Sequence, residues 1–245
     1  MNETTSPTLL HAVGVTKRYG DVLALAAVDV SIRAGEAVAV MGASGSGKTT
    51  LLHCLAAVIS PDTGSIRMAR PDGAVVELVG MDEDGRSAVR RSSIGFIFQD
   101  HLLLPELTAV ENAALPLIMA GTPRADAERH AAQWLAHLGL DGMQDRRIGQ
   151  LSGGQAQRVA IARAQVNGAP IVFADEPTGA LDSATSTEVM TALLQSTVRQ
   201  DRSLVVVTHD ADVARRCDRV LHMSDGRLVG ESVAPQQRDV AGGLR

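Results

Sequence analysis

Apolar segments alternate with glycine-bearing turns in the first part of the chain. β-branched and aliphatic side chains alternate or cluster in these segments, which is typical of strands. The segment 37–41 leads directly into a glycine-rich loop, and good helix formers follow at 48–58 until Pro61 and Gly64 interrupt the pattern. The sequence therefore predicts a strand, a loop and a helix in direct succession. The strands expected in this part are residues 9–15, 26–32, 37–41, 65–68, 75–79 and 94–98.

The middle of the chain has the periodicity of helices. The segments 109–120 and 125–138 contain few β-branched residues, and apolar residues of the second segment recur at helical spacing. We expect residues 99–166 to form a helical insertion between strands of the sheet. The apolar residues at helical spacing are Ala127, Ala131, Trp134, Leu135 and Leu138.

The last part of the chain returns to strands. Residues 171–174 and 204–208 are short, continuous apolar runs, typical of buried parallel strands, and a helix is expected between them at 183–199. Asp225-Gly226 predicts a hairpin turn, and a polar tail starts at Ser232. This succession of elements predicts an α/β fold with a mostly parallel sheet.

Composition supports a globular protein and disfavours a nucleic-acid ligand. The chain has 245 residues, of which 45% are hydrophobic, enough for a sizeable core. Only 2% are aromatic and the net charge is −5, so stacking platforms and overall positive charge are both missing. Cys54 and Cys217 lie far apart without the spacing of a metal site, which favours a reduced, cytosolic setting.

The N-terminal residues lack the basic and apolar regions of a secretion signal. The most apolar uncharged run, 112–121, contains Pro116 and is shorter than the roughly twenty residues that a membrane helix needs. We therefore expect any work at a membrane to depend on a partner.

The loop after the segment 37–41 carries the strongest chemical signal. Its sequence GASGSGKT, residues 42–49, fits the phosphate-binding pattern G-x-x-x-x-G-K-[ST]. The glycines let the backbone wrap a phosphate, Lys48 reaches the phosphate oxygens, and the Thr49 hydroxyl can bind Mg²⁺. The alternative, a glycine-rich turn before a helix, is the weaker interpretation because a predicted strand and helix flank the loop.

Two acidic residues follow the buried strand 171–174, at the end where open α/β sheets bind ligands. We expect Asp175 to hold Mg²⁺ through water, and Glu176 to orient and deprotonate an attacking water. An acidic turn that caps the next helix is the alternative. It becomes less favoured once the phosphate-binding loop is considered together with this pair.

Three further candidates each have an ordinary structural explanation. His209 follows the strand 204–208 and could contact a terminal phosphate, although a histidine at a strand end is more often structural. Gln99 closes the strand 94–98, where its amide oxygen could reach the metal or a water, but a surface loop would also accept glutamine. Tyr19, the only tyrosine, could stack on adenine or be a half-exposed turn residue.

A second anion-binding element lies in LSGGQAQRVAIARA, which begins at Leu151. Ser152, Gly153 and Gly154 directly precede a predicted helix, whose free N–H groups and positive end favour an anion. One chain therefore carries two half-sites for what looks like one ligand.

The order of these motifs resembles the nucleotide-binding subunit of an ABC transporter. The resemblance covers about residues 9–229, and LSGGQ between the glycine loop and the acidic strand is highly specific to that superfamily. It implies a P-loop NTPase core with a mostly parallel sheet, an N-terminal antiparallel β subdomain and an inserted α-helical subdomain. The chain would be a single ABC ATPase domain, with a core at 9–98 and 167–231, a helical subdomain at 99–166 and a polar tail at 232–245.

The resemblance also implies ATP and Mg²⁺ as ligands and ATP hydrolysis as the activity. Two subunits would pair head to tail, with Ser152, Gly153, Gly154 and Gln155 acting on the partner's nucleotide and Asp182 linking the two sites. Glu176 and His209 would be the catalytic residues, with His209 in contact with the terminal phosphate, and Gln99 would couple the metal to the helical lobe. The implied metal ligands are Thr49, Gln99 and Asp175. The implied ATP-binding residues are Tyr19, Gly42, Ala43, Ser44, Gly45, Ser46, Gly47, Lys48, Thr49, Thr50 and Gln99.

Residues 94–121 and the sequence ADEPTGALDS are similar to the lipoprotein-release and macrolide-export group. That likeness implies a separate permease, with four spans, and a position on the cytoplasmic face of the cell membrane. The chain departs from the group in an insertion at 69–76, in Ile148, and in Ala56-Ala57-Val58. Two alternatives stay open at this point: a cell-division-type ATPase that signals through a membrane partner, and a DNA-repair ATPase, which usually carries a long insertion that is not visible here.

Overall fold

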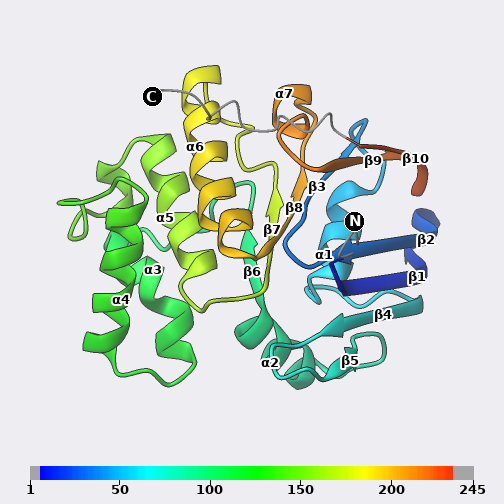
Figure 1. Ribbon diagram of the computed structural model, residues 1–245, viewed down its shortest axis with the longest axis horizontal. Helices are drawn as coiled ribbons and strands as arrows, with labels where there is room; N and C mark the ends of the chain where they lie inside the picture. The colour runs from blue at the N-terminus through cyan, green and yellow to red at the C-terminus, as the bar shows by residue number, and fades with distance from the viewer. Residues whose placement is uncertain (1–5, 234–245) are drawn as a thin grey trace, which may run out of the picture.

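The computed structural model describes residues 6–233 and contains two β-sheets with helices packed around them (Figure 1). The central sheet has six strands in the order β10-β9-β3-β8-β7-β6. Strands β9, β3, β8, β7 and β6 pair in parallel, and β10 joins the edge through an antiparallel hairpin. The strands are β3 (Ala37–Gly42), β6 (Ile94–Ile97), β7 (Ile171–Asp175), β8 (Ser203–Val207), β9 (Arg219–Ser224) and β10 (Arg227–Val233).

The second sheet is antiparallel, with strand order β2-β1-β4-β5, and is built mainly from the N-terminal part of the chain. It lies on the side of the central sheet where helix α1 packs (Figure 1). Its strands are β1 (Thr8–Tyr19), β2 (Val22–Arg33), β4 (Thr63–Ala69) and β5 (Val75–Glu77).

Most helices lie on the opposite side of the central sheet. Helix α5 contacts α3, α4, α6 and strand β6, so it connects the outer helices to the sheet (Figure 1). The α-helices are α1 (Lys48–Leu55), α2 (Glu83–Ser93), α3 (Ala109–Met119), α4 (Arg124–His137), α5 (Gly153–Gln165), α6 (Ser183–Ser196) and α7 (Ala211–Ala214), and the 3₁₀ turns are η1 (Ile148–Gln150) and η2 (Val198–Gln200).

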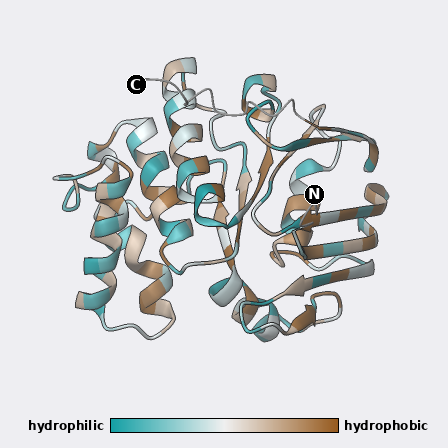
Figure 2. Ribbon diagram, in the orientation of Figure 1, coloured by the Kyte–Doolittle hydropathy of each residue, from teal (hydrophilic) through white to brown (hydrophobic). Residues whose placement is uncertain are grey.

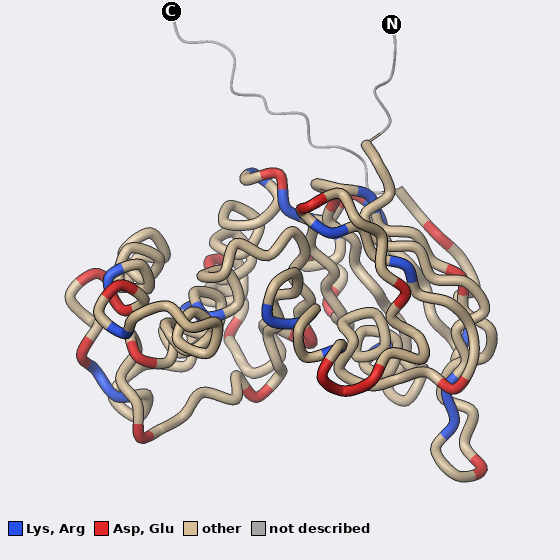
Figure 3. The backbone as a smooth tube through the Cα atoms, turned by 90° about the horizontal axis from the view of Figure 1, so that it is seen from below, with Lys and Arg blue, Asp and Glu red and all other residues tan. Residues whose placement is uncertain are grey.

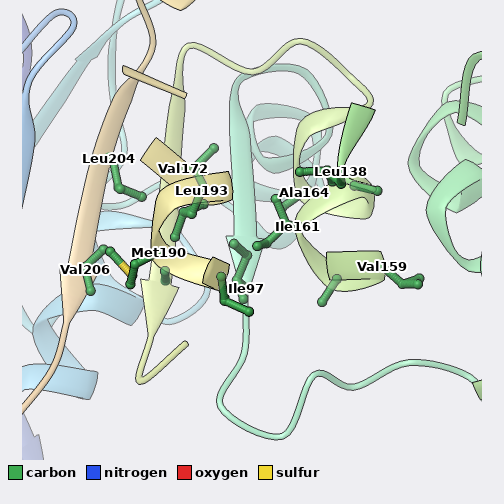
Figure 4. Packing of buried hydrophobic residues seen from close by; sticks show 14 of the residues in the cluster. Ile97, Leu138, Val159, Ile161, Ala164, Val172, Met190, Leu193, Leu204 and Val206 are labelled. Carbon is green, nitrogen blue, oxygen red and sulfur yellow. The ribbon is translucent and has the colours of Figure 1, made fainter. Parts of the chain in front are cut away.

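The central strands are buried on both faces, and their side chains alternate between two apolar cores. Ala37 and Ala39 belong to the core under the helices, whereas Val38 and Val40 belong to the core under α1 and the antiparallel sheet. On the helical face, β7 and β8 side chains pack against α6 (Figure 4). Apolar residues concentrate on the strands, and polar residues cover the outer faces of the helices (Figure 2). The α/β fold, the mostly parallel sheet and the antiparallel sheet predicted from the sequence are confirmed.

Several elements differ from the predictions. Helix α1 ends at Leu55 instead of residue 58 because Ala57 has a left-handed φ of 54°. Strand β1 extends to Tyr19, beyond the predicted end at residue 15. Ser232, where the polar tail was expected to start, lies within β10, which ends at Val233. The remaining tail residues, 234–245, lie outside the described part. Residues 69–76 comprise the end of β4, the turn and the start of β5, and their status as an insertion stays a prediction.

Helix α2 was absent from the predictions because its sequence has few apolar side chains, only Ala88 and Val89. Of its residues only Val89 and Ser93 are buried, and Asp82 caps its start by accepting a 2.8 Å hydrogen bond from the Gly85 N–H. The predicted helix 183–199 is likewise shorter, since α6 ends at Ser196 and the turn η2 follows. The division of the chain into a core and a helical subdomain at residues 99 and 166 stays a prediction.

Charged residues of both signs are interspersed over the described surface (Figure 3). Within residues 6–233, no helix combines the length and apolar character that crossing a membrane requires.

Candidate functional site

A cavity of about 650 Å³ lies at the carboxyl ends of the parallel strands. The loop after β3 forms one wall, Gln99 after β6 and Glu176 after β7 form another, and His209 after β8 completes it. Parallel strands bring these residues to one edge of the sheet although they are far apart in the sequence. The predicted loop residues that line the cavity are Ser44, Gly45, Gly47, Lys48, Thr49 and Thr50.

The glycine loop has a shape that only glycine allows at its critical points. Gly47 has φ 99°, and a Cβ on it would lie 2.4 Å from the carbonyl oxygen of Ala24. A Cβ on Gly42 would lie 2.3 Å from the carbonyl oxygen of Met223. Gly47 is the N-cap of α1 and offers no side-chain acceptor, so the first N–H groups of the helix remain available to an anion.

Lys48 is a buried cation without a carboxylate partner. Lys48 is the first residue of α1 and is only 8% exposed. Its Nζ donates to the carbonyl oxygens of Gly42 (2.9 Å) and Ala43 (2.8 Å). No carboxylate in residues 6–233 lies within 4.0 Å of it. The hydroxyl of neighbouring Ser46 is also buried and has no hydrogen-bond partner in the described part of the chain. A buried ammonium held only by two neutral carbonyls favours an added anion.

Asp175 and Thr49 meet at the bottom of the loop. Asp175 is 5% exposed, and its Oδ1 accepts a 3.2 Å hydrogen bond from the Thr49 hydroxyl. Burial raises the pKa of Asp175, while the hydrogen bond from Thr49 opposes that rise. No cluster of three or more His, Cys, Asp or Glu side chains with metal-binding geometry occurs among the described residues. One carboxylate and one hydroxyl fit Mg²⁺, which is commonly held by one or two protein oxygens together with substrate phosphates.

Glu176 lies at the mouth of the cavity in a constrained backbone. Its φ is 46°, its N–H donates to the Val207 carbonyl (2.9 Å), and its carbonyl accepts from the Gly179 N–H (3.1 Å). Its Oε2 is 2.8 Å from Nδ1 of His209, whose side chain is 71% exposed against 16% for Glu176. The structure therefore brings together a carboxylate that can accept a proton and an imidazole that orients it.

The segment Ser152–Gln155 lies outside this cavity of its own chain. Ser152 caps α5: its hydroxyl accepts from the Gln155 N–H (3.3 Å), and Gln155 Oε1 accepts from the Ser152 N–H (2.9 Å). Ser152 and Gly153 are exposed. The two loop-and-helix elements predicted from the sequence are therefore both present but lie apart within one chain, and their role as half-sites stays a prediction.

Thr185 lies between Asp182 and Gly154, the second glycine of this segment. Asp182 caps α6 and accepts hydrogen bonds from the N–H groups of Ala184 (3.1 Å) and Thr185 (3.0 Å) and from the Thr185 hydroxyl (2.7 Å). These bonds, from Thr185 first, lower the pKa of Asp182. A Cβ on Gly154 would lie 2.4 Å from Thr185 Cγ2. Nothing in the sequence marked Thr185 as the residue between them.

Tyr19 does not line the cavity. It is the last residue of β1 and 51% exposed, and Lys17 Nζ lies 5.7 Å from the centroid of its ring. Its stacking on a base stays a prediction.

Sequence reasoning missed part of the cavity wall. Leu23 and Ala24 of β2 and the turn Asp225-Gly226 also line it. The Gly226 N–H donates to the Ser46 carbonyl (3.0 Å), and its carbonyl accepts from the Ala26 N–H (2.9 Å). The dipeptide Asp225-Gly226 signalled a hairpin, but no local pattern indicated that this hairpin reaches the glycine loop.

His53 lies beside this site but does not line the cavity. It lies one turn after Thr49 on α1, and its ring packs against Phe96 (5.4 Å between centroids) and Phe98 (6.5 Å). Burial lowers its pKa, and nearby Asp175 opposes this. Its spacing from Thr49 on one helix face was the available signal.

Known proteins match this chain in both sequence and fold. The ABC transporter family profile matches residues 25–179. The macrolide export ATP-binding/permease protein MacB of Nitrosomonas europaea is 44% identical over 242 residues, 97% of this chain and 36% of its own length. The pyoverdine export ATP-binding/permease protein PvdT of Pseudomonas aeruginosa is 44% identical over 238 residues, 95% of this chain and 35% of its own length. The chain thus spans about a third of the length of these relatives.

A solved structure of similar fold matches nearly the whole of this chain. The ATP-binding cassette MJ0796, in a dimeric post-hydrolysis state bound to ADP and Pi, has a TM-score of 0.83 and 37% sequence identity. The match covers 93% of this chain and 100% of that one.

Proposed function

Because this chain belongs to the ABC transporter family and is an ATPase cassette of it, we propose that it hydrolyses Mg-ATP in a head-to-tail homodimer and thereby drives a membrane permease of the export type. The observation that carries the proposal is the separation of the two phosphate-binding elements. The glycine loop, Glu176 and His209 share one cavity, whereas Ser152–Gln155 lies outside it.

The residues of the cavity would divide the work of hydrolysis. Lys48 and the loop N–H groups bind the β- and γ-phosphates, and Glu176, held by His209, accepts a proton from the water that attacks the γ-phosphate in line. Thr49, Asp175 and Gln99 would hold Mg²⁺, which when bound supplies positive charge against the charge that develops on the phosphates.

The exposed start of α5 supports a shared site. Its free N–H groups and the hydroxyl of Ser152 suit the terminal phosphate of a nucleotide that sits in a second copy of the chain. A twofold axis would then give two such sites, each made from the glycine loop of one copy and Ser152–Gln155 of the other. The dimeric structure of MJ0796 with ADP and Pi is in line with this.

A groove of about 470 Å³ supports a permease partner. It is lined by apolar residues, among them Phe96 of β6, Phe98 just after β6, Leu102, and Met119 of α3, and also by Arg90 and Arg163. Leu102 and Met119 are 57% and 70% exposed. The relatives' names join an ATP-binding part to a permease, and this chain spans only a third of their length. We propose that a cytoplasmic segment of a four-span permease docks here and holds the ATPase at the cytoplasmic face of the membrane.

The exported molecule would be selected by the permease. A macrolide, a peptide or a lipoprotein fits the relatives' names and the group that residues 94–121 resemble. The cell-division-type alternative uses the same ATP cycle and differs only in the partner.

Light scattering with the purified chain tests the proposal. The Glu176→Gln variant should bind Mg-ATP, become dimeric in ATP but not in ADP, and lose turnover, because the amide cannot take the proton. Lys48→Ala should stay monomeric in both nucleotides. A Glu176→Gln chain that stays monomeric at saturating Mg-ATP, both alone and with the permease encoded beside it, would overturn the proposed dimer.

A further inference from the structure

Arg163, near the end of α5, is a half-buried cation without an acidic partner. Within residues 6–233 no carboxylate lies within 4.0 Å of its guanidinium. Its two terminal nitrogens donate instead to the carbonyl oxygens of His101 (2.6 Å) and Leu102 (2.7 Å). Both acceptors belong to the segment that immediately follows Gln99.

The segment that Arg163 holds has an unusual backbone. His101 and Leu102 have φ values of 60° and 46°, a region that residues other than glycine rarely adopt. Such a conformation persists only where the surroundings impose it. Inside the segment, the His101 N–H donates to the Phe98 carbonyl (3.0 Å) and the Leu102 N–H to the Asp100 carbonyl (2.6 Å). The two bonds from Arg163 tie the backbone of this turn to α5, and the side chain of Gln157, also on α5, lies against the His101 ring.

The other end of the same segment is held by α3. Asn112 is fully buried; its Nδ2 donates to the carbonyls of Leu104 (3.0 Å) and Thr108 (3.0 Å), and its Oδ1 accepts from the Leu104 N–H (2.8 Å). Helices α3 and α5 are in contact. The chain from Gln99 to Thr108 is therefore fixed to the helices at both ends.

Helix α5 joins this segment to the exposed Ser152. Arg163 and Ser152 lie at opposite ends of the helix, about 16 Å apart along its axis at the usual rise per residue. Between them α5 is packed on both sides, with Val159, Ala160 and Ile161 fully buried. A well-packed helix moves as a rigid body, so a displacement of one end reaches the other.

We propose that Arg163 is a positioning residue that fastens the Gln99 segment to α5, so that Gln99 in the nucleotide cavity and Ser152 at the dimer face move as one unit. The proposal rests on the ATPase cycle proposed above and assigns a residue that regulates it. Arg163 also lines the 470 Å³ groove beside Leu102. A permease segment docked in that groove would therefore contact the turn that Arg163 holds.

Arg202 provides a matched control. It is a second half-buried arginine, directly before β8, and it donates to the last residue of α5, at the Gln165 carbonyl (3.3 Å) and Gln165 Oε1 (2.9 Å). Burial lowers the pKa of both arginines. Arg202 packs on Trp134 (5.4 Å) and has no hydrogen bond to the Gln99 segment among the described residues.

The test compares Arg163→Met and Arg163→Lys with Arg202→Met and Arg202→Lys in the full chain. In Arg163→Met we expect the KM for ATP to change less than about twofold while kcat falls about tenfold, a size typical of residues that couple sites. Arg163→Lys should recover part of kcat, because an ammonium can reach one carbonyl but not both. Hydrogen exchange should speed up at residues 100–104 and at residues 152–156 in both Arg163 variants and at neither place in the Arg202 variants.

Either of two results would overturn the inference. One is a folded Arg163 variant with wild-type kcat and wild-type exchange at residues 152–156. The other is an equal loss of kcat in the matched Arg202 variant, which would indicate a general effect on stability. Should Arg163→Met fail to fold, the Lys pair decides by the same criteria. A failure of the proposed function can be told apart from a failure of this inference. If the proposed function is wrong, the wild-type chain itself will neither hydrolyse ATP nor dimerise. Hydrogen exchange at residues 100–104 and 152–156 would still show whether Arg163 couples the two segments.

Discussion

Glu176, which follows β7, and His209, which follows the neighbouring parallel strand β8, are in hydrogen-bond contact. Oε2 of the Glu176 carboxylate lies 2.8 Å from Nδ1 of the His209 imidazole. The Glu176 N–H also donates to Val207, the last residue of β8, so backbone and side chain both fix Glu176 to that strand. A carboxylate held in this way loses less rotational freedom when it orients a water.

Replacing His209 should slow hydrolysis without preventing nucleotide binding. In His209→Ala we expect kcat to fall by about a hundredfold, within the range for residues that support proton transfer, while the affinity for Mg-ATP changes little. His209→Gln should recover part of kcat, because its amide can still donate to Glu176. Steady-state hydrolysis and equilibrium binding measure the two quantities. Equal loss in the Ala and Gln variants would contradict an orienting role.

Lys48→Met should weaken nucleotide binding itself. Among residues 6–233 the Lys48 ammonium bonds to the carbonyls of Gly42 and Ala43 and to no carboxylate, so it can donate to a phosphate without breaking a salt bridge. A charged hydrogen bond of about 1.5–3 kcal/mol corresponds to a loss of affinity of about ten- to a hundredfold. Calorimetric titration with Mg-ATP measures it. Adenosine, which has no phosphate, serves as the control ligand and should bind both proteins equally.

Gly154→Ala should destabilise the contact between α5 and α6. The added methyl would meet Thr185 Cγ2 at 2.4 Å, and overpacking of this kind costs about 1–3 kcal/mol. Thr185→Ser removes the methyl and keeps the hydroxyl that donates to Asp182. The double variant should therefore recover most of the stability, as measured by urea unfolding. Additive effects of the two substitutions would show that this contact is not the cause.

Glu83→Gln should lower stability at neutral pH and have less effect in acid. Hydrogen bonds from Arg90 and Arg86 hold the pKa of Glu83 at about 2, below its ordinary 4.5. Since the folded protein binds this proton less tightly than the unfolded chain, the ionised group stabilises above pH 4.5, and that contribution is lost as the pH falls toward 2. Urea unfolding at pH 7 and pH 3 should show the gap between variant and wild type shrinking.

Asp84→Asn is the control for this comparison. Asp84 lies in the same first turn of α2 but forms no ion pair within 4.0 Å among the described residues. Its substitution should produce a smaller pH-dependent change than Glu83→Gln. The reverse order would contradict the role of the two arginines.

The sequence was sufficient where the chemistry is local. The loop 42–49 needs a strand before it and a helix after it, and both are visible in the apolar pattern, so β3, the loop and α1 could be predicted together. Helix α2 could not, because it is stabilised by Asp82, by Glu83 and its two arginines, and by the Arg90 bond to the Ala57 carbonyl (2.7 Å), while it buries little apolar surface.

What the sequence determined by itself is the set of residues at the strand ends and the presence of two glycine-bearing segments that each lead into a helix, since each depends on neighbours along the chain. Only the tertiary structure decided that Gln99, Glu176 and His209 share a cavity with the glycine loop, and that Ser152–Gln155 lies outside it. It also placed Gly226 against Ser46, Thr185 between Gly154 and Asp182, and Arg163 on the turn after Gln99. These relationships depend on the order of strands in the sheet and on how α5 packs across it. Neither can be predicted from the pattern of apolar and polar residues along the chain.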